Sequence, residues 1–265
     1  MFAFDPMLMT AGAATGTLVG LTGVGGGAVM TPLLLLVFGV APMSAIGTDL
    51  WFAAITKIAA TRIHHGHGLI DWQVVRRLWL GSLPASALTL LWMQMVPIGA
   101  GTAGFLKLMI ACAVVLTALA MLFQKQLHEL GRKFRIESVE SFKALQGPLT
   151  IAAGAALGIL VTLTSIGAGA LGVVFLAYLY PLRLTASRLI ATDIVHAIPL
   201  AMFAGAGHLI IGNVNFALLG NLLVGSIPGV IVGALLSTYL PQIYLRRGLS
   251  AILLFTGYKL LNIAV

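Results

Sequence analysis

Two aspartates occupy matching positions in the two strongly apolar halves of this chain. Asp49 directly follows Thr48, and Asp193 directly follows Thr192. A carboxylate deep in an apolar helix costs at least ~2.5–3.5 kcal/mol on membrane-insertion scales, so a pair at equivalent positions indicates a function. One role is to carry a proton, because burial favours the protonated form of a carboxyl group. The other is structural, with each carboxylate accepting hydrogen bonds or pairing with a base.

A glycine-rich break precedes each aspartate. The first break contains Gly25, Gly26 and Gly27, and the second contains Gly167 and Gly169. Glycine lets the backbone leave helical geometry, and the free N–H groups of the helix that starts after a break favour an anion. We therefore expect the two breaks to meet near the middle of a membrane and form a substrate pocket. The alternative is close helix packing through small residues.

Two basic side chains accompany the aspartates. Lys57 follows Asp49 by about two turns of the same predicted helix, and His196 follows Asp193 by three residues, which places these two on one face. Both are candidates for contacting an anion or relaying a proton, and we expect Thr48 and Thr192 to line the same centre. For Lys57 the alternative is a side chain that extends to the membrane surface.

Metal and enzyme chemistry find little support. His64, His65 and His67 form a short tract in a polar connection without a nearby Cys or Glu, so we predict a loop and no metal site. Cys112 is the one cysteine, and no recognisable protease or hydrolase motif is present in the sequence. The sequence predicts neither a catalytic residue nor a cofactor.

The composition requires a membrane around these residues. Hydrophobic residues make up 60% of the chain and charged residues 8%, and the mean hydropathy is +1.06. Soluble domains carry about 25% charged residues, so a soluble protein is excluded. The net charge is +8, but Lys and Arg lie mostly between apolar segments, as the positive-inside rule describes. We therefore predict a lipid bilayer and no nucleic acid as partner.

The chain divides into two membrane halves, residues 1–123 and 147–265, joined by a polar, cytoplasmic linker at 124–146. We predict an all-α membrane protein with five apolar segments in each half. Segments 28–40 and 170–181 are short: thirteen helical residues reach only ~20 Å, against ~30 Å of hydrocarbon. Each short segment either re-enters the membrane or spans steeply inside the protein. The ten segments are 7–23, 28–40, 44–62, 73–96, 101–123, 147–164, 170–181, 185–206, 213–237 and 247–264.

The basic residues predict the orientation. They form four clusters: Arg62–Arg77, Lys125–Lys143, Arg183 with Arg188, and Arg246 with Arg247. Two apolar segments lie between each cluster and the next, so all four clusters can be cytoplasmic. Both termini are then periplasmic. An odd number of segments per half inserts the halves upside down, as an inverted repeat with a pseudo-two-fold axis in the membrane plane.

Several short motifs of this chain are shared with one known family: Pro32 after the first break, Ile46–Leu50, His64–Trp72, Gly81–Pro84, Ala191–Asp193 and Gly225–Pro228. Through these motifs the sequence resembles the TauE/SafE family of sulfite and organosulfonate permeases over essentially its whole length. This resemblance implies a bacterial inner-membrane carrier that exports small sulfur oxyanions or sulfonates, driven by the proton or charge gradient.

These observations lead to one hypothesis and one alternative. The hypothesis is a secondary transporter that exports sulfite or an organosulfonate by alternating access, with Asp49 and Asp193 coupling transport to protons. The alternative is a passive anion channel or uniporter on the same fold. The expected partners are a small anion and the bilayer, and the sequence leaves open whether the protein acts as a monomer or a homodimer.

Overall fold

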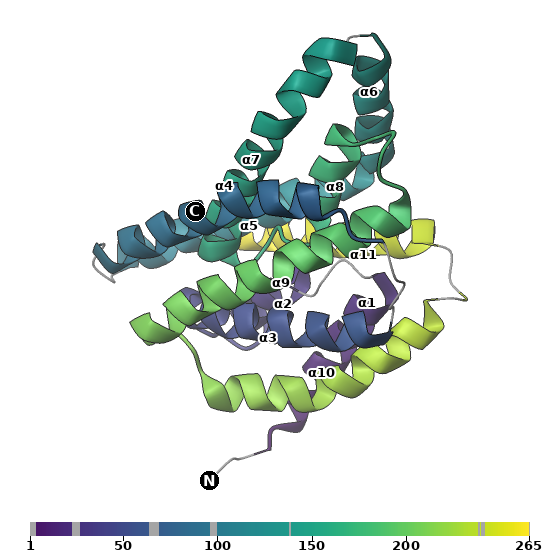
Figure 1. The fold of residues 1–265 in the computed structure, drawn as a ribbon. Coiled ribbons are helices and arrows are strands. Elements are labelled where there is room, and N and C mark those ends of the chain that lie inside the picture. Colours follow the sequence, from purple (N-terminus) through teal and green to yellow (C-terminus); the bar gives the residue numbers. More distant parts are fainter. Residues whose placement is uncertain are drawn as a thin grey trace.

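The computed structural model describes residues 4–22, 27–63, 69–95, 100–137, 139–237, 239 and 242–264. In these ranges the regular structure is entirely helical, and each of the ten apolar segments coincides with one helix (Figure 1). An additional helix, α6, forms in the linker. The helices are α1 Pro6–Thr22, α2 Gly27–Leu36, α3 Pro42–Ile63, α4 Trp72–Met95, α5 Ala100–Leu122, α6 Gln124–Glu137, α7 Val139–Thr164, α8 Ala170–Leu179, α9 Ala186–Ile211, α10 Phe216–Leu236 and α11 Gln242–Ala264.

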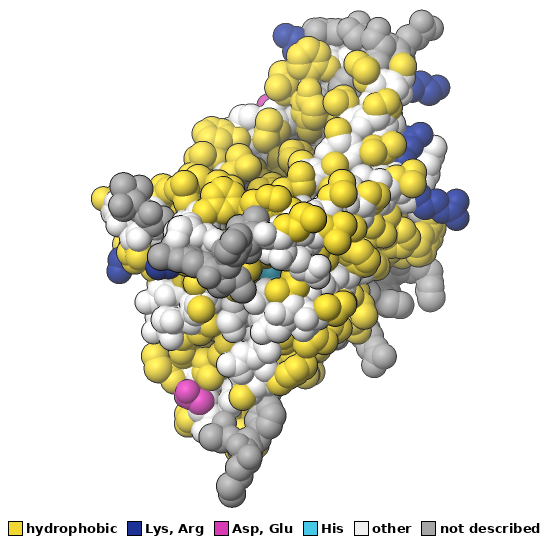
Figure 2. Space-filling view, turned by 90° about the vertical axis from the view of Figure 1, so that its left-hand side faces the viewer, with side chains coloured by type: hydrophobic (Ala, Val, Ile, Leu, Met, Phe, Trp, Pro, Cys, Tyr) yellow, Lys and Arg dark blue, Asp and Glu magenta, His cyan; other side chains and the backbone are white. Residues whose placement is uncertain are grey.

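The outer surface of the molecule suits a lipid environment. Four of the described helices contain a stretch long and apolar enough to cross a membrane: Gly101–Leu122, Lys143–Thr164, Ala186–Ile211 and Phe216–Leu236. Large hydrophobic side chains such as Leu80 stand exposed on the outside. Figure 2 shows a face made mainly of hydrophobic side chains, with Lys and Arg at its margins. An apolar surface of this extent is typical of contact with a membrane.

Helices of the first half pack mainly on helices of the second half. α1 packs on α10, α4 on α7, α5 on α11 and α3 on α9. Two of these pairs approach closely because glycine lies at the contact. A Cβ atom on Gly16 would collide with the carbonyl oxygen of Ser226, and one on Gly158 with that of Ser82. Close approach through small residues is the usual way in which helices associate in membranes.

The second short helix, α8, runs back along α7. The amide of Gln146 donates a hydrogen bond of 2.5 Å to the carbonyl of Leu179, and the hydroxyls of Thr150 and Tyr180 lie 2.8 Å apart. The end of α8 is therefore level with an early turn of α7. Ten helical residues extend only ~15 Å. In this half the second arm of the break thus folds back along the first as a helical hairpin.

The linker helix α6 lies on the second half. His128 contacts the carbonyl of Ala177 through Nδ1 at 3.2 Å, and Gly131 packs against the backbone of Tyr178. At the start of α6, Gln124 Oε1 accepts a hydrogen bond of 2.6 Å from Arg246 of α11. The linker is thus an ordered helix that holds α8 and α11.

The apolar core that supports the centre comes from both halves. Leu50 of α3, Ile110 of α5, Val161 of α7 and Leu200 of α9 are almost completely buried and belong to one cluster. This core fixes the relative positions of α3 and α9, the helices that carry the two aspartates.

Candidate functional site

Four ionisable side chains lie inside the protein where α3 and α9 meet. The exposed fraction is 0% for Asp49, 3% for Lys57, 1% for Asp193 and 0% for His196. Groups of this kind are costly to bury unless they are paired or hydrogen-bonded. We call these four residues the central cluster.

Asp49 connects α3 with α2 and with the second break. The hydroxyl of Thr31 in α2 donates a hydrogen bond of 2.5 Å to Asp49 Oδ2. Ser165, the first residue after α7, lies beside this carboxylate and has a positive φ of 59°. Among the described residues, neither Asp49 Oδ1 nor the Ser165 hydroxyl has a hydrogen-bond partner. The unused oxygen and hydroxyl leave a polar face next to Asp49.

Asp193 packs against the start of α8. The backbone N–H of Gly169, the N-cap of α8, lies close to its carboxylate. Gly172 must be glycine because a Cβ atom there would collide with Asp193 Oδ1. Within the described chain, Oδ1 has no hydrogen-bond partner. We expected the N–H groups after the second break to face an anion, but those of Leu171, Gly172 and Val173 donate to backbone carbonyls of the break itself. The N–H of Gly169 lies beside the protein's own carboxylate.

Lys57 reaches across from α3 to the second break. Its Nζ donates a hydrogen bond of 2.9 Å to the carbonyl of Ala168. The ammonium is close enough to Asp193 and Asp49 to interact with both charges, with Asp193 the stronger partner. No ion pair shorter than 4.0 Å joins these three described side chains. Lys57 thus points into the protein and does not extend to the membrane surface.

His196 faces α4. Its Nε2 lies 3.0 Å from the hydroxyl of Ser82, and its backbone carbonyl accepts a hydrogen bond of 3.2 Å from Trp79 Nε1. Its Nδ1 is buried and has no partner among the residues that the structure describes. His196 shares α9 with Asp193, but its hydrogen-bond partners lie on α4.

The two threonines anchor the starts of other helices. The hydroxyl of Thr48 accepts a hydrogen bond of 3.0 Å from the backbone N–H of Asn215, directly before α10. That of Thr192 accepts one of 3.1 Å from the backbone N–H of Asp71, directly before α4. Both hydroxyls keep their own proton for a further contact.

Asp71 is a buried residue that the sequence reasoning missed. It is 5% exposed, and Arg183 binds it through Nε at 2.6 Å from Oδ2 and through Nη2 at 2.9 Å from Oδ1. Its position directly before Trp72 is a helix N-cap signal that could have identified it. The partners Thr31 and Ser82 carry no comparable signal in the sequence.

Several predicted residues contribute through their backbone or lie elsewhere. Gly167 and Gly169 have φ values of 119° and 120°, a conformation that favours glycine. Gly27 is the first residue of α2, whereas Gly25, Gly26, His64, His65 and His67 lie outside the described residues. In the part of the chain that is described, no group of three or more His, Cys, Asp or Glu side chains could hold a metal ion.

The charge of the central cluster determines what it can bind. With both aspartates ionised, Lys57 protonated and His196 neutral, two negative charges and one positive charge leave a net charge of −1. One proton on either carboxyl makes the cluster neutral. The arrangement can therefore accept a proton, and the ammonium of Lys57 can contact an anion.

The chain is similar to known membrane proteins. It matches the family described as "Sulfite exporter TauE/SafE" over residues 8–260. The "Probable membrane transporter protein YjnA" of Bacillus subtilis (strain 168) is 35% identical over 210 residues, covering 78% of this chain and 80% of the relative. The "Probable membrane transporter protein YunE" of the same strain is 26% identical over 222 residues, covering 79% and 80%. A "Probable membrane transporter protein" of Haemophilus influenzae is 36% identical over 83 residues, covering 29% of this chain and 31% of the relative. No solved structure matches.

Proposed function

Because this chain belongs to the sulfite exporter TauE/SafE family and is a membrane transporter, we propose that it exports a small sulfur-containing anion across the bacterial inner membrane. Sulfite or an organosulfonate is the substrate class. The observation that carries the proposal is the central cluster, in which Lys57 and the glycine-rich start of α8 lie together inside the protein. A buried ammonium group is a charged donor that binds an oxyanion.

We propose that proton binding accompanies anion binding. The cluster has a net charge of −1 when both aspartates are ionised, so an entering anion adds a second negative charge in a site without water access. Protonation of Asp49 or Asp193 removes this repulsion. A pH difference across the membrane then biases the direction of the flux. Acid on the side from which the anion is taken up favours its binding and accelerates its transport to the other side.

Alternating access requires two related halves, and equivalent contacts support an inverted repeat. The contact between Gly16 and Ser226 has a counterpart in that between Gly158 and Ser82. The sequence of residues 16–28 recurs in similar form at 158–170, and that of 81–84 recurs at 225–228. Gly16 therefore corresponds to Gly158 and Ser82 to Ser226, so exchanging the two halves turns one contact into the other. This exchange is what a pseudo-two-fold axis produces.

The threonine contacts follow the same rule. Thr48 accepts from the backbone of Asn215, and Thr192 accepts from the backbone of Asp71. Thr48 corresponds to Thr192, and Asp71 to Asn215. We propose that rocking of the two halves about this axis exposes the central cluster first to one side and then to the other.

The orientation of the carrier follows from its basic residues, and we propose that both termini are periplasmic. Three of the connections predicted to be cytoplasmic line one cavity at one end of the molecule. They contribute Lys125, the 181–185 connection and Arg246. Their convergence supports placing this end in the cytoplasm.

The test is anion flux in proteoliposomes. Sulfite, thiosulfate, sulfoacetate and chloride are offered with and without an imposed pH gradient. Gradient-driven accumulation of a sulfur anion, with chloride excluded, is the expected result. Simple equilibration identifies a channel or uniporter and contradicts coupling, whereas the absence of flux for every sulfur anion contradicts the substrate class.

A further inference from the structure

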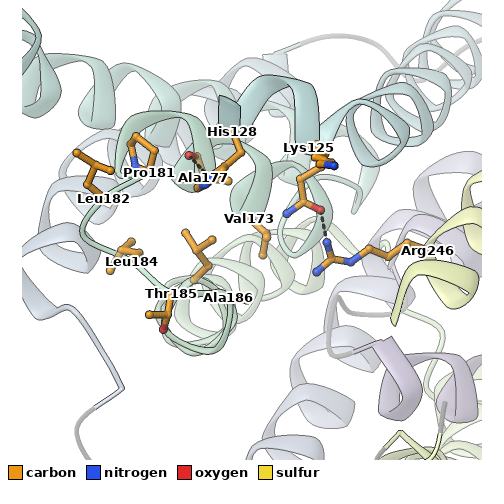
Figure 3. Close-up of a pocket in the computed structure, with 12 residues that line it drawn as sticks. Lys125, His128, Val173, Ala177, Pro181, Leu182, Leu184, Thr185, Ala186 and Arg246 are labelled. Carbon is orange, nitrogen blue, oxygen red and sulfur yellow. Dashed lines mark hydrogen bonds between the residues drawn. The ribbon is translucent and has the colours of Figure 1, made fainter. Parts of the chain in front are cut away.

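A cavity of about 440 Å³ lies between α6, the connection from α8 to α9, and the start of α11. Lys125, His128 and Arg246 line it, together with Thr185 and Ala186 at the start of α9, and no acidic side chain belongs to its lining. Figure 3 shows the three basic residues grouped around one side and Thr185 with Ala186 below them. Residues of the central cluster do not contribute to this cavity.

Arg246 is the principal cation of the cavity. Its Nη1 donates to Gln124 Oε1 at 2.6 Å, which fixes the guanidinium at the wall. No carboxylate of the described residues lies within 4.0 Å of it, so most of its donors are available. A guanidinium group matches the geometry of a phosphate in a bidentate contact.

The other two basic side chains are also available to a ligand. His128 donates from Nδ1 to the carbonyl of Ala177, so its Nε2 can donate to an anion only when the ring carries a second proton. Lys125 lies 3.9 Å from Glu129, and the two side chains are 88% and 63% exposed. Exposed pairs of this kind contribute about 0–1 kcal/mol, so a stronger anion can replace Glu129.

The start of α9 adds free backbone donors. Thr185 is the N-cap of this 26-residue helix, and its side chain makes no capping hydrogen bond. The first N–H groups of a helix have no partner within the helix, and the helix dipole favours an anion there. The cavity thus combines three basic side chains with an uncapped helix start.

We propose that this cavity binds a phosphate group, carried by an anionic membrane lipid or by a soluble phosphate. Apolar side chains complete the lining, among them Val173, Leu184 and the 62% exposed Leu182. These side chains give the glycerol and the first acyl carbons of a lipid a place to pack. The bound phosphate joins the linker helix to α9 and α11 and stabilises the cytoplasmic end that we propose.

Binding is tested on the purified full chain in detergent. Phosphatidylglycerol or phosphatidylcholine is titrated in one arm, and inorganic phosphate or chloride at equal ionic strength in the other, with the unfolding temperature as the readout. We expect phosphatidylglycerol or phosphate to raise this temperature. A response to phosphatidylglycerol alone identifies a lipid as the source, and a response to inorganic phosphate identifies a soluble ligand.

Three variants locate the site. Arg246→Gln is expected to weaken binding about tenfold or more, because a charge-assisted hydrogen bond is lost. Arg247→Gln is the matched control: this neighbouring arginine is exposed and does not line the cavity. Gln124→Ala removes the hydrogen bond to Arg246 but keeps the charge, and binding is expected to stay within about threefold of the unaltered protein. Equal weakening by the two arginine substitutions, unchanged binding in Arg246→Gln, or no response to either phosphate source overturns the proposal.

Discussion

Lys57 compensates two buried carboxylates without a direct ion pair to either. Its hydrogen bond to the carbonyl of Ala168 holds the ammonium at the second break, where it interacts with both charges. Since a salt-bridge partner does not occupy the ammonium, an incoming anion meets a cation that is already desolvated and oriented. Such a group contributes both to binding and to the stability of the empty site.

Replacement of Lys57 by Gln is expected to reduce anion flux at least about tenfold, because the variant loses a charged donor worth ~1.5–3 kcal/mol. The measurement is sulfite flux in proteoliposomes. Lys259→Gln is the control, since Lys259 is exposed on α11. Equal flux in the two variants would remove Lys57 from the substrate site.

Replacement of both aspartates by Asn is expected to abolish the pH dependence of transport. In the unaltered protein a lower pH strengthens anion binding, because protonation of Asp49 or Asp193 removes a negative charge beside Lys57. Asn resembles the protonated form, so the double variant Asp49→Asn/Asp193→Asn should bind the anion equally at acid and alkaline pH. Flux that still follows an imposed pH gradient in this variant contradicts proton coupling through these residues.

At the residue scale the sequence identified the ionisable groups but not their partners. Asp49, Lys57, Asp193 and His196 stand out because charge is rare in an apolar helix. The partners Thr31, Ser82 and Ala168 contribute a hydroxyl or a carbonyl, and such groups are unremarkable in membrane helices. Their roles arise only when α2, α4 and the second break are packed around α3 and α9.

At the element scale the close helix crossings depend on glycine. Gly16→Ala and Gly158→Ala each place a methyl group against a carbonyl oxygen of the facing helix, and overpacking of this kind costs about 1–3 kcal/mol. We expect both variants to lower the unfolding temperature in detergent. Gly104→Ala is the control because its Cβ atom meets nothing within 4 Å, and alanine stabilises an open helix position by up to about 1 kcal/mol. Similar losses in all three variants would rule out the crossings as the cause.

In the second break glycine is needed for its backbone conformation. Gly169 has a φ of 120°, and its N–H lies close to the carboxylate of Asp193. Gly169→Ala is expected to cost ~1–3 kcal/mol of stability, because an L residue rarely adopts this backbone conformation. The unfolding temperature provides the measurement, with Gly248→Ala as control, since Gly248 has open space around its Cβ position. A Gly169→Ala variant as stable as the control would contradict this backbone conformation.

Continuous apolar segments were sufficient to locate the helices, but helix ends required capping detail. The segment predicted at 185–206 extends to Ile211, where Gly212 ends the helix in a left-handed conformation with a φ of 86°. The segment predicted from 213 begins at Phe216 because Asn215 caps it. The reversal of α7 into α8 could not be predicted, since a short apolar helix satisfies both a spanning and a re-entrant arrangement.

At the scale of the whole molecule the orientation is directly testable. In a Cys112→Ala background, a membrane-impermeant maleimide should label Ile210→Cys in intact cells, because the connection after α9 is predicted to be periplasmic. Lys133→Cys in α6 should react only after the membrane is permeabilised. The 80% exposure of Ile210 and the exposed position of Lys133 make both sites reactive wherever the reagent reaches them. The reverse pattern contradicts the orientation.

The pairing of helices across the halves lay beyond single-sequence reasoning. The repeated motifs predicted that α1 corresponds to α7 and α4 to α10. They did not reveal that α1 packs on α10 or α4 on α7, because neighbours in space are set by three-dimensional packing and not by the order of the segments. The linker was expected on the cytoplasmic face, but its contacts with α8 and α11 depend on single residues such as Gly131.

The position of α6 has a kinetic consequence. α6 rests on α8 through His128 and Gly131 and is tied to α11 by Gln124, and it belongs to neither repeated half. If the halves rock as we propose, these contacts must loosen when the end covered by α6 opens, and we expect this step to have the higher barrier. The two directions of transport would then share one equilibrium but differ in maximal speed. Initial rates measured from both faces of oriented vesicles report this difference directly.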